Sequence, residues 1–348
     1  MGLEPPIDQK NPLGSATSGV PFDVPLTAVW RGDLIESVHH GRYVVRSTDE
    51  EAIDSLGDPE AYVYLRSAAK PFQALPLVFS GAADAFGLTD EELAIICASH
   101  TAEPRHLAAV RSILRKATLS EDDLQNDAHP PMHTLTAARL ARGGDEPRPI
   151  HGNCSGKHAG MLAVCVHAGW DPAGYRDPEG PLQKLVRQTV AELCGLRPAA
   201  VRLAGDGCGV PVFALPLENL ALGFARFVAG GVEALPQDLS EAVRRVRDAM
   251  RAHPFMIGGT GRFDTRLMEE TELVAKSGAE GVFAAGSPAG WGLALKISDG
   301  AGRAVAPVAL AALSRRGVRI PHEMRFFPAK DLRGRVVGKI TSLIHGNP

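Results

Sequence analysis

The sequence predicts an α+β fold, in which strands from both ends of the chain form one mostly antiparallel sheet and a helical lobe is inserted between them. Segments rich in β-branched and aromatic residues occur before residue 66 and again after residue 272. Most of the chain between them carries apolar residues at helical spacing. We therefore expect a disordered tail over 1–20, a sheet lobe formed by 21–66 plus 270–348, and a mainly helical lobe over 67–269.

The N-terminal part begins with a tail rich in proline, glycine and serine, which lacks the basic start and apolar run of a secretory signal. Strands at 26–30 and 35–47 then flank the turn Arg31-Gly32-Asp33 and predict a β-hairpin. A short strand at 62–65 leads into a helix from about 68 to 79, whose Pro71 is tolerated only in the first turn. Ser67 should therefore lie near a helix N-terminus.

The middle of the chain is predicted to be helical and the last part to return to strands. Thr89 and Glu92 form a plausible capping box at the start of one helix. Further helices are expected at 105–116, 133–141, 158–167, 182–193, 239–252 and 304–315. Late strands are expected at 273–276, 281–285, 291–298 and 335–344, with Asp299-Gly300 as a turn.

Composition favours a small-molecule substrate. A formal net charge of -3 gives no long-range attraction for nucleic acid or an anionic membrane. No apolar run reaches the roughly 20 residues that a membrane-spanning helix needs. The 5 cysteines are an odd number without the spacing of a disulfide framework, which suits a reducing compartment. We expect a cytoplasmic protein that binds neither nucleic acid nor membrane.

Three short fragments are candidates for a catalytic site, because each contains a serine and two of them also contain a lysine. They are Ser67-Ala68-Ala69-Lys70, Ser99-His100 and Lys276-Ser277-Gly278. Residues three apart on a helix share a face, so the Lys70 amine can approach the Ser67 hydroxyl. The first fragment alone is common by chance. Together, however, the fragments follow the S-x-x-K, S-x-x, K-S/T-G order of active-site serine β-lactamases and penicillin-binding proteins. We interpret them as a catalytic site rather than as separate surface pairs.

A lysine base must be uncharged. The usual lysine pKa of about 10.4 leaves the amine protonated at neutral pH. Lys70 must therefore be desolvated, or lie near another positive charge such as Lys276 or a metal ion. An alkaline-shifted pH optimum is the expected consequence.

Two cysteines are candidate metal ligands. Cys154 starts a predicted helix, and Cys208 lies in the glycine-rich turn Asp206-Gly207-Cys208-Gly209 after a strand at 201–204. Two thiolates with one or two nitrogen donors can hold zinc. From the residues alone, His158 is a better third ligand than Lys157, because neutral imidazole donates without first losing a proton.

Four segments carry a resemblance to a known family: residues 66–73, 97–100, 152–161 and 206–211. Together they resemble the Rhizobium etli-type L-asparaginases, over about residues 25–344. The run from 152 to 161 is the most specific. The resemblance implies a serine β-lactamase/glutaminase-like fold, a homodimer, and hydrolysis of the side-chain amide of L-asparagine to L-aspartate and ammonia.

The resemblance also implies roles for individual residues. It pairs Ser67 with Lys70 and Ser99 with Lys276, and it places Arg66, His158 and Asp206 at the substrate. Its zinc ligands are Cys154, Lys157 and Cys208, so Lys157 replaces His158 as the nitrogen ligand. We expect this zinc to orient the substrate, because Ser67 already supplies a nucleophile. Ala102 departs from the family, in which a glycine-type residue is expected.

Two other functions fit part of the pattern. A β-lactamase or peptidoglycan peptidase would share the serine and lysine fragments, although the cysteine pair and the absence of an export signal oppose it. A non-catalytic asparagine-binding protein would keep the fold without the chemistry. The serine and lysine set favours the amidohydrolase.

Overall fold

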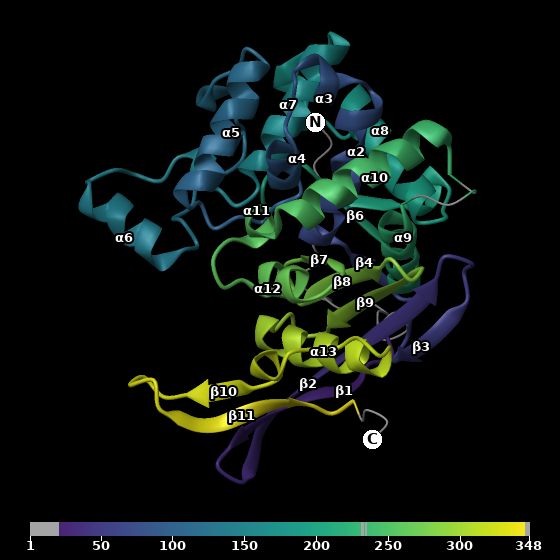
Figure 1. Cartoon of the computed structure of the whole chain (residues 1–348), viewed down its shortest axis with the longest axis vertical. Coiled ribbons are helices and arrows are strands. Elements are labelled where there is room, and N and C mark those ends of the chain that lie inside the picture. Colours follow the sequence, from purple (N-terminus) through teal and green to yellow (C-terminus); the bar gives the residue numbers. More distant parts are fainter. Residues whose placement is uncertain (1–20, 231–232, 234, 345–348) are drawn as a thin grey trace, which may run out of the picture.

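A large antiparallel sheet forms one half of the molecule (Figure 1). The computed structural model describes residues 21–230, 233 and 235–344, so the predicted tail over 1–20 lies outside the described residues. Across the sheet the strands follow the order β10 (Phe327–Lys330), β11 (Val336–Ser342), β1 (Val24–Arg31), β2 (Leu34–Ser47), β9 (Trp291–Ile297), β8 (Val282–Ser287) and β7 (Val274–Ser277), and β3 (Ala52–Leu56) pairs with β2.

The two ends of the chain pair directly with each other. Strand β1 lies antiparallel to β11, with Thr27 opposite Ser342. Strand β2 lies antiparallel to β9, with Gly41 opposite Ile297. The predicted α+β fold, with a mostly antiparallel sheet built from both termini, is therefore confirmed.

Helices cover both faces of this sheet. A Cβ atom on Gly292 of β9 would lie 2.1 Å from the carbonyl oxygen of Ala221, which shows that helix α9 (Leu217–Ala229) packs closely on this face. The side chain of the preceding residue, Trp291, points to the face opposite α9, because side chains alternate along a strand. There Arg316, directly after helix α13 (Val305–Arg315), stacks over its ring. The sheet is thus the middle of three layers.

The segment between β3 and β7 is mainly helical and lies above the sheet in Figure 1. Its helices are α1 (Lys70–Gln73), α2 (Leu75–Phe79), α3 (Ala82–Ala85), α4 (Asp90–Ile96), α5 (Pro104–Lys116), α6 (Thr134–Arg142), α7 (Ser155–Ala168), α8 (Pro181–Leu193), α9, α10 (Gln237–Ala252), α11 (Pro254–Gly258) and α12 (Phe263–Glu270). The predicted capping box is present, since Thr89 and Glu92 exchange hydrogen bonds at the start of α4. The exact lobe boundaries remain a prediction.

A small sheet inside this segment was not predicted as a unit. Strands β4 (Tyr62–Tyr64), β6 (Pro211–Pro216) and β5 (Arg202–Gly205) pair antiparallel in that order. Strand β6 passes directly into α9, so a single apolar run serves two elements. The small sheet brings the chain at 65 beside the chain at 213, where the Leu65 N–H bonds to the Phe213 carbonyl oxygen.

Within the described part of the chain, no helix is long and apolar enough to cross a membrane.

Candidate functional site

Ser67 lies where strand β4 changes into a helical segment. Arg66 has a φ of 49° in the left-handed region, which turns the chain sharply out of the strand. A short 3-10 turn, Arg66–Ala69, follows and passes into α1, with Pro71 in its first turn as predicted. This turn presents the Ser67 side chain at the end of the small sheet.

The two candidate lysines meet at Ser99. The buried Lys70 ammonium donates to the Ser99 Oγ at 3.0 Å and to the Ala98 carbonyl oxygen at 2.6 Å. Lys276, from β7, donates to the same Ser99 Oγ at 3.0 Å. The predicted pair of Ser99 with Lys276 is therefore hydrogen-bonded.

The predicted pair of Ser67 with Lys70 is arranged differently. Among the described residues, Lys70 hydrogen-bonds to Ser99 and not to Ser67. The Lys70 side chain starts in the first turn of α1 and reaches the carbonyl oxygen of Ala98, just after the end of α4. Ser67 and Lys70 still line the same cavity. The short spacing along the chain brought the two residues to one cavity, although Ser67 lies in the 3-10 turn and Lys70 begins α1, and it did not fix their hydrogen bonds.

Burial sets the protonation of the two lysines. It lowers the pKa of Lys70 to about 7, and the positive charges of Lys276 and Lys157 act in the same direction. Burial also lowers the pKa of Lys276, but the Asp264 carboxylate, 3.5 Å from its ammonium, opposes this shift. Lys70 can thus be neutral near pH 7, as the sequence argument requires of a base.

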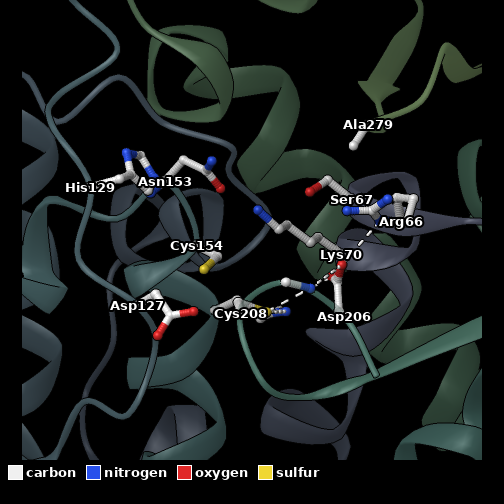
Figure 2. Close-up of a pocket in the computed structure, with 12 residues that line it drawn as sticks. Arg66, Ser67, Lys70, Asp127, His129, Asn153, Cys154, Asp206, Cys208 and Ala279 are labelled. Atoms are coloured by element: carbon white, nitrogen blue, oxygen red, sulfur yellow. Dashed lines mark hydrogen bonds and ion pairs between the residues drawn. The ribbon is translucent and has the colours of Figure 1, made fainter. Parts of the chain in front are cut away.

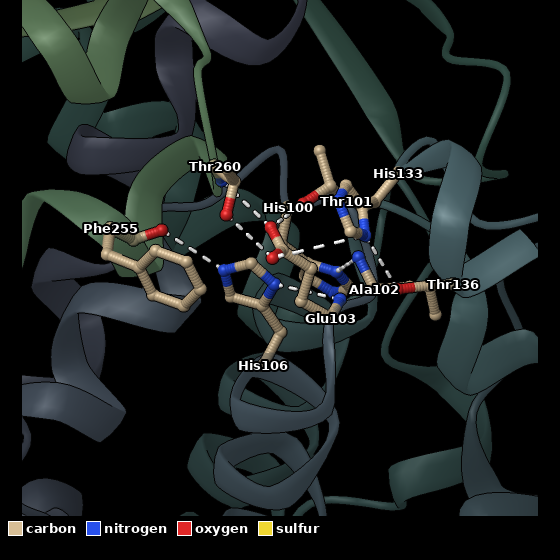
Figure 3. Close-up of polar contacts among 9 residues, drawn as sticks. All are labelled: His100, Thr101, Ala102, Glu103, His106, His133, Thr136, Phe255 and Thr260. Atoms are coloured by element: carbon tan, nitrogen blue, oxygen red, sulfur yellow. Dashed lines mark hydrogen bonds and ion pairs between the residues drawn. The ribbon is translucent and has the colours of Figure 1, made fainter.

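The loop that carries Ser99 is held by buried polar contacts (Figure 3). The Ser99 N–H bonds to the Ile257 carbonyl oxygen. The Glu103 carboxylate accepts the Thr101 hydroxyl at 2.8 Å, and it accepts both the N–H and the hydroxyl of Thr260 at 2.8 Å. Glu103 therefore ties the Ser99 loop to the chain between α11 and α12.

Ala102 within this loop has a φ of 59° and is fully buried. A side chain in the left-handed region costs roughly 1–2 kcal/mol. The family resemblance led us to expect a glycine-type residue at this position. The backbone does take the left-handed conformation that glycine adopts readily, although the residue is alanine.

A cavity of about 170 Å³ lies in front of Ser67 (Figure 2). It is lined by Arg66, Ser67, Lys70, Asp127, His129, Asn153, Cys154, Lys157, Asp206, Gly207, Cys208 and Ala279. Figure 2 shows Ser67 and Ala279 at one side and Asp127 and His129 at the other, with the Lys70 side chain between them. Arg66 and Asp206 form an ion pair at 3.0 Å in its wall.

Most of the predicted site residues line this cavity, but three do not. Ser99 and Lys276 are reached through Lys70, and His158 is fully buried. His158 was expected at the substrate, yet its Nδ1 lies 2.6 Å from the Tyr175 hydroxyl and it is absent from the cavity wall. The sequence analysis missed Asp127 and His129, which lie on a loop without a recognisable motif. Asn153 was also not predicted as a site residue, although its position directly before the candidate ligand Cys154 could have indicated it.

The two candidate cysteines come together from separate elements. Cys154 begins α7, which approaches α4 closely because Gly156 has no side chain: a Cβ there would lie 2.2 Å from the Ile95 carbonyl oxygen. The ligand atoms of Cys154, His158 and Cys208 all lie within 4.8 Å of one another. The Lys157 ammonium donates to the Cys208 Sγ at 3.2 Å.

The electrostatics of this cluster favour a thiolate. A hydrogen bond from the Cys154 thiol lowers the pKa of Cys208 and raises that of Cys154, so the pair shares one proton. Burial lowers the pKa of His158 to about 4, which leaves its ring neutral at pH 7. Its buried Nε2 has no hydrogen-bond partner among the described residues. Two sulfurs and such a nitrogen match the donors of a tetrahedral zinc site.

Comparisons with solved structures found distant similarity. A crystal structure of Mglu in its native form is 16% identical with a TM-score of 0.44; the match covers 79% of this chain and 64% of that one. The probable glutaminase ybaS is 16% identical with a TM-score of 0.39, covering 74% of this chain and 78% of that one. A probable glutaminase from Bacillus subtilis, complexed with 6-diazo-5-oxo-L-norleucine, is 12% identical with a TM-score of 0.36, covering 78% of this chain and 83% of that one.

No curated protein matches the sequence. The sequence profile of one family, L-asparaginase II, matches residues 27–342. This match includes most of β1, all of β11 and every residue that lines the cavity. The chain therefore belongs to the L-asparaginase II family and is an amidohydrolase.

Proposed function

We propose that this protein is an L-asparaginase of the Rhizobium etli type, which hydrolyses the side-chain amide of L-asparagine to L-aspartate and ammonia by a serine-lysine mechanism. The observation that carries the proposal is the Lys70 amine, buried and with a pKa of about 7, in the same cavity as the Ser67 hydroxyl. A neutral amine beside an accessible hydroxyl is the arrangement that activates a serine nucleophile.

The cavity wall suits a small zwitterion. Arg66 contributes positive charge, and Asp127 and Asp206 contribute negative charge. An amino acid carries both an α-carboxylate and an α-ammonium group, and each can pair with the opposite charge on the wall. We assign Arg66 and Asp206 to these contacts, because Arg66 precedes Ser67 in the chain and pairs with Asp206 in the same cavity wall.

Ser67 is the proposed nucleophile because it lines the cavity, whereas Ser99 is not one of the residues in the cavity wall. Its oxygen attacks the amide carbon while its proton passes to Lys70. The N–H groups of Ser67 and Ala279 are proposed to bind the oxyanion. Lys70 is linked through the Ser99 hydroxyl to Lys276, and this chain returns a proton to the departing ammonia. Water then hydrolyses the aspartyl ester.

Zinc is the proposed metal, with Cys154, Lys157 and Cys208 as its ligands. The sulfurs of Cys154 and Cys208 lie close together, and Lys157, which contacts the Cys208 sulfur, would lose its proton to bind the metal. Bound zinc would supply positive charge at the cavity wall and orient the substrate. His158, which is buried behind the wall, is then a supporting residue of the thiol cluster.

An assay of ammonia release tests the proposed function. We expect release from L-asparagine to exceed release from L-glutamine, and no hydrolysis of the β-lactam nitrocefin. Nitrocefin turnover without ammonia release from either amino acid would identify a β-lactamase instead. Calorimetric binding of asparagine without ammonia release would identify a binding protein.

The remaining proposals concern assembly and location. The resemblance implies a homodimer, and sedimentation of the purified protein would test it. The absence of a disulfide framework among the 5 cysteines supports a cytoplasmic location.

A further inference from the structure

Asp264 is a buried carboxylate that contacts the strand carrying Lys276. It lies in the first turn of α12 and is 4% exposed. One of its oxygens accepts the Ser277 N–H at 2.9 Å and lies 3.5 Å from the Lys276 ammonium. Its other oxygen accepts the Ser277 hydroxyl. Every one of these contacts is with the end of β7.

Lys276 needs a compensating charge. Its side chain is fully buried, and its ammonium donates to the Ser277 carbonyl oxygen at 2.7 Å and to Ser99 Oγ at 3.0 Å. Removing the partner of a buried charge is strongly destabilising, because the charge is left without water or counterion.

Four titratable or charged groups surround the Lys276 ammonium. Arg262, before α12, is a cation, and Lys70, from α1, is the neutral amine of the proposed mechanism. Cys97, at the end of α4, is a neutral thiol, because burial raises its pKa to about 12. Asp264 is therefore the anion of this group, and it is the group whose charge favours the ammonium form of Lys276.

We propose that Asp264 is a positioning residue that holds Lys276 as an ammonium ion against the Ser99 hydroxyl. Its contacts with Ser277 fix the end of β7, and its charge keeps Lys276 protonated while Lys70 is neutral. The two lysines then have different tasks: Lys70 accepts a proton and Lys276 supplies one. This assignment of tasks rests on the proposed function.

Two variants separate the charge of Asp264 from its hydrogen bonds. Asp264→Asn removes the negative charge, and its amide oxygen can still accept the Ser277 N–H. Ser277→Ala removes the hydroxyl contact and leaves the charge in place.

Nuclear magnetic resonance of ¹³C-lysine-labelled protein gives a readout that does not depend on activity. The Lys276 signal is identified by its loss in Lys276→Met, and its shift is followed against pH. We expect the titration midpoint to fall by about 1–3 pH units in Asp264→Asn, the effect of an opposite charge at this range. Ser277→Ala should keep the wild-type midpoint. An unchanged midpoint in Asp264→Asn, or an equal shift in Ser277→Ala, overturns the proposal.

The pH profile of ammonia release provides the second arm. Loss of the Lys276 proton should end activity at alkaline pH, so this limit should move to lower pH in Asp264→Asn by the same amount as the midpoint. If the wild-type protein releases no ammonia, the proposed function is wrong. The titration midpoint of Lys276 still decides whether Asp264 holds Lys276 as an ammonium ion. A midpoint that shifts without any change in the activity profile overturns the assignment of Lys276 as proton donor.

A double variant covers the case in which Asp264→Asn does not fold. If Asp264 compensates Lys276, then Asp264→Asn combined with Lys276→Met should be more stable than Asp264→Asn alone, since the unpaired ammonium has been removed. Equal or lower stability of the double variant would show that Asp264 acts only as a tie between α12 and β7.

Discussion

Lys70 and Lys276 are identical side chains in different electrostatic surroundings. Both are buried, and both donate to Ser99 Oγ. Burial, with two other lysines nearby, lowers the pKa of Lys70 to about 7 against the opposing effect of Cys154 and Cys208, whereas Lys276 faces Asp264. The difference between a base and a proton donor therefore arises from the neighbours of each lysine.

The pH dependence of kcat/KM follows from the pKa of Lys70. The folded-state pKa is depressed from its usual 10.5 to about 7, so the neutral, basic form predominates above pH 7. We expect kcat/KM to rise about tenfold per pH unit below pH 7, to level off above it, and to fall again at the alkaline limit set by Lys276. A profile that is flat from pH 5 to 8 would contradict a lysine base. Lys70→Met, which cannot accept a proton, should lose the pH-dependent activity altogether.

Zinc content distinguishes the two candidate nitrogen ligands. In the proposed site Lys157 binds the metal, so Lys157→Met should lower the zinc content of the purified protein and His158→Gln should retain it. Elemental analysis of both variants and of Cys208→Ser measures this directly. Retention of zinc in Lys157→Met and its loss in His158→Gln would assign the site to Cys154, His158 and Cys208.

The sequence identified site residues that belong to short motifs. Ser67, Lys70, Cys154 and Cys208 all line one cavity, as the motifs indicated. Asp264 was not identified, because a single aspartate at a helix start has no distinctive spacing and its partner is in another element.

The close contact between α9 and the large sheet depends on small residues. Gly292 allows the α9 backbone to approach β9, and a Cβ atom would lie 2.5 Å from the Ala225 backbone nitrogen. These neighbours are backbone atoms, which cannot move aside as a flexible side chain does.

Gly292→Ala should therefore be destabilising. Overpacking of a filled core costs typically about 1–3 kcal/mol, and we expect the upper part of that range, measured by urea unfolding. Gly174→Ala is the matched control, because a Cβ there meets nothing within 4 Å and the residue has no positive φ. The control should change stability by no more than about 0.5 kcal/mol. Equal stability of the two variants would refute the close packing of α9.

Helices with a strong local sequence signal were predicted correctly. The helix at 105–116 was predicted from its spacing, and the structure has Pro104–Lys116. The capping box of Thr89 identified the start of α4. Strand β6 and helix α9 were missed because they share one mostly apolar run, in which Pro216 alone stands at the change from strand to helix.

The whole molecule brings together residues that are far apart in the chain. Arg66 and Ala279 line the same cavity, although the entire helical segment lies between them. The chain before Arg66 packs directly against the chain after β7, since a Cβ atom on Gly278 would lie 2.8 Å from the Leu65 carbonyl oxygen. Strand composition at both ends predicted the sheet, but it could not predict which loops form the far wall. Asp127 therefore became visible only in three dimensions.

The central claim is that Ser67 forms an ester with the aspartyl group of asparagine. Rapid mixing of asparagine with the protein, followed by acid quench, measures ammonia and intact protein mass together. We expect an ammonia burst of about one per chain with an aspartyl adduct on the protein. Ser67→Ala should lack the adduct and lose activity by about a thousandfold or more. An adduct or near wild-type ammonia release in Ser67→Ala would contradict the account.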